Sequence, residues 1–259
     1  MNLRSRREFL QIGGAAACAA LARAADPVLG MIFPPANYPV PPEAPLLYPN
    51  VKFLAEGVGL ERMTPEEYDR VFDRILPAAK KQAAQGARAI DVMGTSLTFY
   101  KGAAFNQRLI DTIRKETGLP ATTMSTGIVE GLHAVGGRRV AVATAYNNEV
   151  NRRLGVFLEE SGFEVLTVKG LGIERFEDSP PVTHDSLLQF SASVWESARK
   201  ADALVVSCGA LKTLDLLVPL EARCKVPVVS STPHALRAGV RLLGLSGRAP
   251  GYGSLLEKS

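Results

Sequence analysis

The 259-residue sequence has few of the residues from which metal sites and disulfide frameworks are built, with three cysteines and three histidines. His133, His184 and His234 are far apart, and none has a cysteine or carboxylate at a metal-ligand spacing. Beyond the first 24 residues the cysteines are Cys208 and Cys224, which make no disulfide framework, although an oxidising compartment would permit one bond between them. We therefore expect no metal site.

Phosphate-binding motifs and a basic surface are also lacking. The sequence contains neither a Walker loop nor a Gly-x-Gly-x-x-Gly pattern, so we expect no nucleotide cofactor. The formal net charge is +4, but residues 1–24 hold four arginines and one glutamate, which leaves about +1 for the rest of the chain. With no basic patch, nucleic acid is not an expected partner.

The first 24 residues have the order of an export signal. Ser5–Leu10 reads Ser-Arg-Arg-Glu-Phe-Leu, a twin-arginine pattern, and is followed by an apolar stretch, Ile12–Leu21, and a small-x-small cleavage site, Ala22–Ala24. The apolar stretch is too short for a stable membrane anchor. A chance basic start before a buried helix is the alternative. We predict a twin-arginine signal peptide over residues 1–24, cleaved near Ala24, and a periplasmic protein.

In the remaining residues, about 235, apolar β-rich runs alternate with amphipathic segments. We predict strands over Val28–Phe33, Ala89–Met93, Ala121–Met124, Arg139–Thr144, Glu164–Val168, Ala203–Ser207 and Val226–Ser230, with Val51–Gly57 as a further candidate. We predict helices over Pro65–Gln85, Gly102–Thr117, Asn148–Ser161, Ser186–Lys200 and Leu211–Cys224. This alternation is typical of α/β folds, in which helices cover both faces of a parallel sheet.

A short motif occurs twice. Residues 92–97 read Val-Met-Gly-Thr-Ser-Leu and residues 206–211 read Val-Ser-Cys-Gly-Ala-Leu, so that Gly94 falls opposite Cys208 at an offset of 114. Two further segment pairs match in the same order at offsets near 107 and 111. Chance likeness between β-rich strands is one explanation, and duplication of an α/β unit is the better one.

Duplication predicts two pseudo-symmetric Rossmann-like lobes, each a parallel four-stranded sheet flanked by helices. We place the first lobe at residues 25–137 and the second at 138–232, with residues 233–259 packing back on the first. Ligands of parallel sheets bind beyond the carboxyl ends of the strands, so the active site is expected in the cleft between the lobes.

Cys208 is the strongest candidate for chemistry, because it ends a predicted strand and is followed by Gly209, which permits close approach of a ligand. A helix starting near Leu211 would favour a thiolate or a bound anion. Thr95 and Ser96 occupy the corresponding turn of the first half and could donate to a carboxylate. Alternatively, Cys208 is a small core residue, and the hydroxyls of Thr95 and Ser96 cap a helix.

Tyr146 follows another predicted strand, and its phenol could donate to the same anion, or simply lie at the rim of the cleft. Cys224 lies within a helical pattern and is expected in the core.

Several of these segments together resemble the arylmalonate decarboxylases, within the aspartate/glutamate and hydantoin racemase superfamily. The matching segments span most of the chain in order and are Gly30–Pro35, Met93–Asn106, Thr122–Thr126, Arg139–Tyr146, Ser207–Gly209 and Pro250–Gly253. The Gly-Thr-Ser-Leu-x-Phe-Tyr block within them is the most specific part.

The resemblance implies decarboxylation of α-substituted malonates without a cofactor. One carboxylate would bind in a dioxyanion hole made by Thr95, Ser96, Tyr146 and backbone N–H groups near Cys208 and Gly209. The other would leave as CO2, and Cys208 would protonate the resulting enediolate on one face. Racemases and isomerases of the superfamily use two cysteines across the cleft, whereas this sequence has Gly94 at the first position.

The pocket for the departing carboxylate is lined in the family by small or branched apolar residues. Pro34 and Leu60 fit that lining, whereas Met63 and Phe176 are bulkier and Ser179 is polar. The alternatives to a decarboxylase are a racemase or maleate-type isomerase, and a periplasmic carboxylate-binding protein without activity. In each case we expect a monomer whose partner is a small dicarboxylate.

Overall fold

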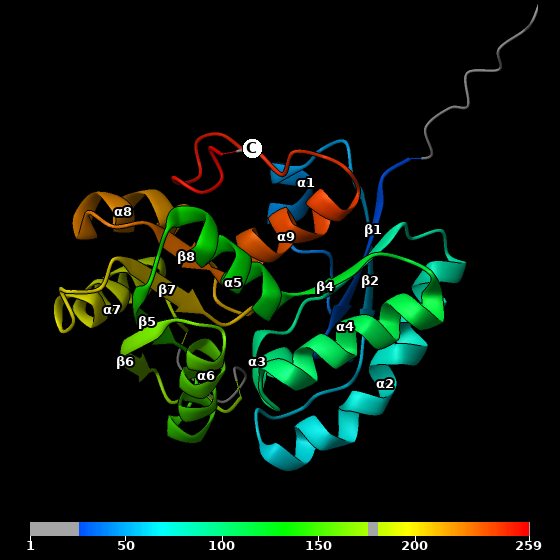
Figure 1. Cartoon of the computed structure of the whole chain (residues 1–259), viewed down its shortest axis with the longest axis horizontal. Helices are drawn as coiled ribbons and strands as arrows, with labels where there is room; N and C mark the ends of the chain where they lie inside the picture. Colours follow the sequence, from blue (N-terminus) through cyan, green and yellow to red (C-terminus); the bar gives the residue numbers. More distant parts are fainter. Residues whose placement is uncertain (1–25, 176–180, 259) are drawn as a thin grey trace, which may run out of the picture.

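Two four-stranded parallel sheets lie side by side in the computed structural model, which describes residues 26–175 and 181–258 (Figure 1). The strands are β1 (Val28–Phe33), β2 (Lys52–Gly57), β3 (Ala89–Val92), β4 (Ala121–Thr123), β5 (Arg139–Thr144), β6 (Glu164–Gly170), β7 (Ala203–Ser207) and β8 (Val228–Ser230). Their orders, β2-β1-β3-β4 and β6-β5-β7-β8, repeat the same topology. This confirms the predicted α/β class with two similar halves.

The helices, in chain order, are α1 (Glu43–Leu47), α2 (Pro65–Ala84), α3 (Thr95–Phe99), α4 (Ala103–Thr117), α5 (Met124–Val135), α6 (Asn148–Glu160), α7 (His184–Glu196), the 3-10 turn η1 (Leu214–Leu216), α8 (Leu217–Cys224) and α9 (Ser231–Leu242). In the first half α2 contacts β1, β2 and β3, and α4 contacts β4. In the second half α6 contacts β6, α7 contacts β5 and β6, and α8 contacts β8. No helix in the described part of the chain is long and apolar enough to cross a membrane.

The last helix of each half packs on the sheet of the other half. Helix α5 follows β4 but contacts β7 and β8, and α9 follows β8 but contacts β3 and β4. The two helices also pack closely against each other, and a Cβ on Gly127 of α5 would lie 2.9 Å from Ala235 Cα of α9. This exchange brings the first residues of both helices to the junction between the sheets, at the carboxyl ends of β3 and β7.

The strand predictions agree with the observed bounds within about two residues, including the candidate strand β2. Helices α1, α3, α5 and α9 were not predicted. Helix α9 contains Pro233, which is tolerated because it lies in the first turn, where backbone N–H groups have no partner within the helix. The residues from Ser231 to Val240 are all buried, including the polar Thr232, His234 and Arg237, so polar residues in this segment do not indicate a solvent-exposed face.

One predicted helix is corrected. Leu211–Cys224 was expected as a single helix, but the chain forms turns after Cys208, then η1, and enters α8 only at Leu217. No helix therefore begins beside the Cys208 thiol. Cys224 is fully buried at the end of α8, as expected, and both cysteines are free thiols.

Candidate active site

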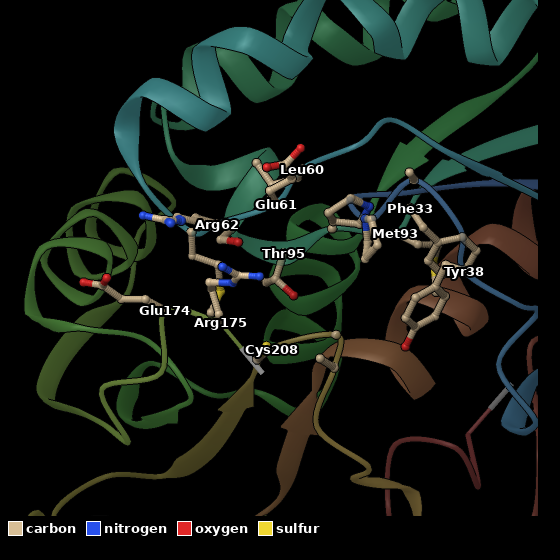
Figure 2. Close-up of a pocket in the computed structure, with 18 of the residues that line it drawn as sticks. Phe33, Tyr38, Leu60, Glu61, Arg62, Met93, Thr95, Glu174, Arg175 and Cys208 are labelled. Carbon is tan, nitrogen blue, oxygen red and sulfur yellow. The ribbon is translucent and has the colours of Figure 1, made fainter. Parts of the chain in front are cut away.

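A cavity of about 450 Å³ opens between the two halves, at the carboxyl ends of their strands. Its lining comes from the segments after β1, β2, β3, β5, β6 and β7. Nine residues selected from the sequence line it together: Pro34, Leu60, Met63, Gly94, Thr95, Ser96, Tyr146, Cys208 and Gly209. Phe176 and Ser179 lie outside the described residues, as does the predicted signal peptide. Thr95 and Cys208 approach the cavity from opposite halves (Figure 2).

Cys208 is a buried thiol that keeps its proton. It is 5% exposed and follows the buried strand β7. Burial raises the pKa of the thiol to about 11, against smaller lowering effects of the Ala210 backbone N–H and the Tyr146 hydroxyl. The expectation that a helix start near Leu211 would favour the thiolate is therefore wrong, because the helix is not there. A protonated thiol can act as an acid but not as a base.

Thr95 and Ser96 form the first turn of α3, and neither side chain caps that helix. Thr95 Oγ1 lies 2.8 Å from Met124 Sδ and 2.9 Å from Ser231 Oγ, the first residues of α5 and α9. Both Thr95 and Ser96 are buried yet line the cavity. A hydrogen bond from either hydroxyl to a bound ligand would form in surroundings where water competes poorly for it.

Tyr146 places a phenol in the same cavity. The side chain is 1% exposed, and its hydroxyl has no hydrogen-bond partner among the described residues. Burial, with a contribution from nearby Cys208, raises the pKa of Tyr146 well above its ordinary value, so the hydroxyl remains a donor. A buried donor without a partner costs stability unless a ligand or water satisfies it. Among the residues that the structure describes, Tyr68 Oη of α2, near Ser96, is likewise buried without a hydrogen-bond partner.

Gly94 lines the same cavity as Cys208 and is itself tightly packed. A Cβ at this position would lie 2.6 Å from Pro34 Cγ and 3.0 Å from Leu97 Cβ. Pro34, Leu60 and Met63 form an apolar wall of the cavity. The cavity thus combines one thiol, several hydroxyl donors and an apolar surface.

Sequence reasoning missed the charged and aromatic residues of the cavity. Glu61, Arg62, Glu174 and Arg175 line its opening, and Tyr38 stacks on Phe33 at the other side (Figure 2). These residues lie in irregular segments, where no periodic pattern predicts which side chains face inward. The signals that the sequence offers for this cavity lie at strand ends, and only the higher charge of the segment after β6 points to this region.

The lining contains no metal-ligand cluster. No group of three or more histidine, cysteine, aspartate or glutamate side chains converges anywhere in residues 26–175 and 181–258. His234 is fully enclosed in α9, where burial lowers its pKa to about 4 and Nδ1 accepts a hydrogen bond from the Ser230 N–H at 2.8 Å. The neutral imidazole therefore serves the packing of α9.

Comparisons with known proteins agree with this geometry. The family model of arylmalonate decarboxylase matches residues 29–256. Arylmalonate decarboxylase from Bordetella bronchiseptica is 44% identical over 238 residues, which cover 92% of this chain and 99% of the relative. A liganded crystal structure of arylmalonate decarboxylase, with one glycine replaced by cysteine and one cysteine by serine, covers 90% of this chain and 100% of its own, with TM-score 0.87 and 44% identity.

A more distant structure shares the fold. Maleate isomerase from Pseudomonas putida, solved with maleate, has a TM-score of 0.80 at 20% identity over 90% of this chain and 98% of its own. Fold and cavity thus define a two-lobed α/β enzyme with one thiol in the cleft between two parallel sheets. The chain belongs to the arylmalonate decarboxylase family. It is a carbon–carbon lyase of the carboxy-lyase type.

Proposed function

We propose that this enzyme removes one carboxylate from α-substituted arylmalonates, without a cofactor, and protonates the product on one face. The observation that carries the proposal is the protonated thiol of Cys208, buried beside the hydroxyls of Thr95, Ser96 and Tyr146 in one cavity. Membership in the arylmalonate decarboxylase family supports the substrate class.

Binding begins with the carboxylate that remains in the product. In our proposal it accepts hydrogen bonds from Thr95, Ser96 and Tyr146, with backbone N–H groups of the segment from Cys208 to Gly209 completing the dioxyanion hole. The partnerless hydroxyl of Tyr146 supports this assignment, because an anion would satisfy it. Donors fixed before the reaction stabilise charge that develops later, at no further cost in reorganisation.

The second carboxylate leaves from the apolar wall that includes Pro34, Leu60 and Met63. Poor solvation of a carboxylate there raises its free energy relative to neutral CO2. When the carbon–carbon bond breaks, its electron pair moves into the retained carboxylate and forms an enediolate. Cys208 transfers its proton to the α-carbon, and solvent returns a proton to the thiolate. The net reaction consumes one proton and yields CO2 and a chiral monocarboxylate.

The residue opposite Cys208 argues against a racemase. Racemisation needs one group that removes a proton from one face and another that delivers a proton to the opposite face. Gly94 has no side chain, so a single thiol serves one face only. A carboxylate-binding protein would use the same hydroxyls, but it has no need of a protonated thiol in the cavity.

Turnover in D2O tests the proposal. Mature protein is incubated with phenylmalonate and methylphenylmalonate, and CO2 and product are measured. We expect CO2 release with one deuteron incorporated, and 2-phenylpropionate of one configuration from methylphenylmalonate. Cys208→Ala should be nearly inactive, whereas Cys224→Ala, which alters the other buried cysteine, should retain activity.

Two outcomes would contradict the proposal. Tight binding of both malonates without CO2 release would support a binding protein. Exchange of the α-proton of a monocarboxylate, without CO2 from either malonate, would support a racemase.

We further propose that the enzyme is exported by the twin-arginine route and acts in the periplasm as a monomer. The order of arginine pair, apolar stretch and cleavage site in residues 1–24 supports export. Replacing both Arg6 and Arg7 by lysine should retain the full-length precursor in the cytoplasm. N-terminal sequencing of the periplasmic protein should begin at Ala25, and light scattering should give the mass of one chain. Unchanged export of the lysine variant would contradict the route.

A further inference from the structure

Ser231 connects the two sides of the cavity through one oxygen atom. It is the first residue of α9 and is fully buried. Its Oγ accepts a hydrogen bond from the backbone N–H of Cys208 at 3.0 Å and lies 2.9 Å from Thr95 Oγ1. A single side chain therefore contacts both the residue that carries the thiol and a hydroxyl of the opposite half.

The backbone at Cys208 needs such support. Its φ is 156°, a value that residues with a side chain rarely adopt and that persists only when the surroundings hold it. The hydrogen bond to Ser231 fixes the N–H of this peptide. Thr232, the next residue of α9, donates from Oγ1 to the Gly209 carbonyl at 3.2 Å. The start of α9 thus holds the segment that carries the thiol.

The hydroxyl of Ser231 also determines where the Thr95 proton can point. Thr95 Oγ1 has one proton, and Met124 Sδ and Ser231 Oγ are both within reach of it. In the structure, Thr95 Oγ1 donates to Ser231 Oγ, which also accepts from the Cys208 N–H. When the Thr95 proton turns toward an anion in the cavity, the Ser231 hydroxyl can reverse this hydrogen bond and donate its own proton to Thr95 Oγ1.

The repeat places Met124 where the second half has Ser231. Both begin a helix directly after the last strand of their half. A thioether accepts hydrogen bonds weakly and donates none, whereas a serine hydroxyl does both. The half with Cys208 therefore has the hydroxyl, and the half with Gly94 has the thioether. The two halves therefore differ at this position, as they also differ at Cys208 and Gly94, where the proposed proton donor is present in one half and absent from the other.

We propose that Ser231 is a positioning residue for decarboxylation. It holds the Cys208 peptide in the conformation that aims the thiol at the α-carbon, and with substrate bound it donates to Thr95 while the Thr95 proton reaches the substrate carboxylate. The inference concerning Thr95 rests on the proposed function, whereas the positioning of the thiol is measurable without any substrate.

Three variants test the kinetic role. Ser231→Ala removes the oxygen, Ser231→Thr retains it, and Ser230→Ala is the matched control, since Ser230 is equally buried but contacts Thr213 rather than the Cys208 peptide. For Ser231→Ala we expect kcat on methylphenylmalonate to fall about 10²-fold, as for a misplaced reacting group. KM should change much less, and the enantiomeric excess of 2-phenylpropionate should fall. Ser231→Thr should recover most of both values, and Ser230→Ala should keep the wild-type enantiomeric excess.

Alkylation by iodoacetamide, followed by mass spectrometry of the substrate-free protein, reports the thiol directly. Cys208 should react several-fold faster in Ser231→Ala than in the wild type, while Cys224 reacts equally in both. If the wild type decarboxylates neither malonate but this difference is found, the positioning of Cys208 stands and the proposed function fails. Wild-type kcat, enantiomeric excess and Cys208 alkylation in a folded Ser231→Ala protein would overturn the inference.

Should Ser231→Ala not fold, as judged by circular dichroism, Ser231→Cys supplies the kinetic test. Its thiol has nearly the shape of the hydroxyl but accepts a hydrogen bond weakly. We expect a clear loss of kcat and of enantiomeric excess in this variant. A folded Ser231→Cys protein with wild-type values of both would overturn the inference.

Discussion

Pro34 packs so closely on Gly94 that a Cβ on residue 94 would lie 2.6 Å from Pro34 Cγ. The ring of a proline cannot rotate away as the end of a flexible side chain can. This contact keeps the wall opposite Cys208 free of a side chain. Packing between two strand ends thus maintains the asymmetry on which the proposed protonation of a single face depends.

Gly94→Cys should introduce some racemase activity, because it supplies a second thiol across the cavity from Cys208. It should also lower the unfolding temperature, since Pro34 must shift to admit the Cβ. Loss of optical activity from pure 2-phenylpropionate and exchange of its α-proton in D2O measure the first effect, and calorimetry measures the second. Adding Pro34→Ala should recover part of the stability. A folded variant without any exchange would contradict the assumed two-sided geometry.

Tyr146→Phe should impair catalysis without unfolding the protein. The variant loses a proposed donor to the retained carboxylate. Because of this loss, kcat/KM should fall by about 10²- to 10³-fold. Stability should be preserved, because the hydroxyl makes no hydrogen bond with the described residues. Tyr100→Phe is the control, since Tyr100 also carries a buried hydroxyl without a partner but does not line the cavity. Equal kinetics in the two variants would remove Tyr146 from the proposed hole.

The proposed acid role of Cys208 predicts a particular pH dependence of catalysis. Burial raises the pKa of its thiol to about 11, so the proton is retained in a range where an ordinary cysteine, with a pKa of about 8.5, ionises. We expect kcat/KM to persist at least a pH unit beyond that ordinary value before thiolate formation lowers it. The difference in ultraviolet thiolate absorbance between wild type and Cys208→Ala should titrate at the same high pH. A titration near the ordinary value would show that burial does not protect the proton.

Asp91 of β3 should make stability depend on pH. Its carboxyl is fully buried without a hydrogen-bond partner among the described residues, and burial, with a smaller effect of Glu130, raises its pKa well above the ordinary value. Between the unfolded and folded pKa values the folded state holds a proton that the unfolded state has released. The free energy of unfolding therefore falls as pH rises through this range, by about 1.4 kcal/mol per pH unit.

Asp91→Asn removes this dependence. Urea unfolding at pH 5 and pH 8 should show that the free energy of unfolding of the variant, relative to wild type, is higher at pH 8 than at pH 5. Asp73→Asn, at an exposed position of α2, is the control. A difference between variant and wild type that does not change with pH would mean that Asp91 is already ionised in the folded protein.

Much of the fold could be predicted because its strands are buried on both faces. Such strands read as continuous apolar runs, and β1, β5 and β7 agree with the predicted bounds. Helices α5 and α9 could not be predicted in this way. They pack between the two sheets, and polar residues of α9 such as Thr232, His234 and Arg237 are buried, so polar positions in its sequence do not mark a solvent-exposed face as they do in α2 and α6.

The sequence by itself determined that Gly94, Thr95 and Cys208 meet at the cavity, because the carboxyl ends of parallel strands converge and the repeat aligns Gly94 with Cys208. Only the tertiary structure decided the protonation state of the Cys208 thiol and the hydrogen bonds that hold the Cys208 peptide. Cys208 keeps its proton because burial raises the pKa of the thiol by more than the Ala210 and Leu211 backbone N–H groups lower it. Ser231 reaches Thr95 across 136 positions of the chain because the halves exchange their last helices, a packing that no local pattern in the sequence encodes.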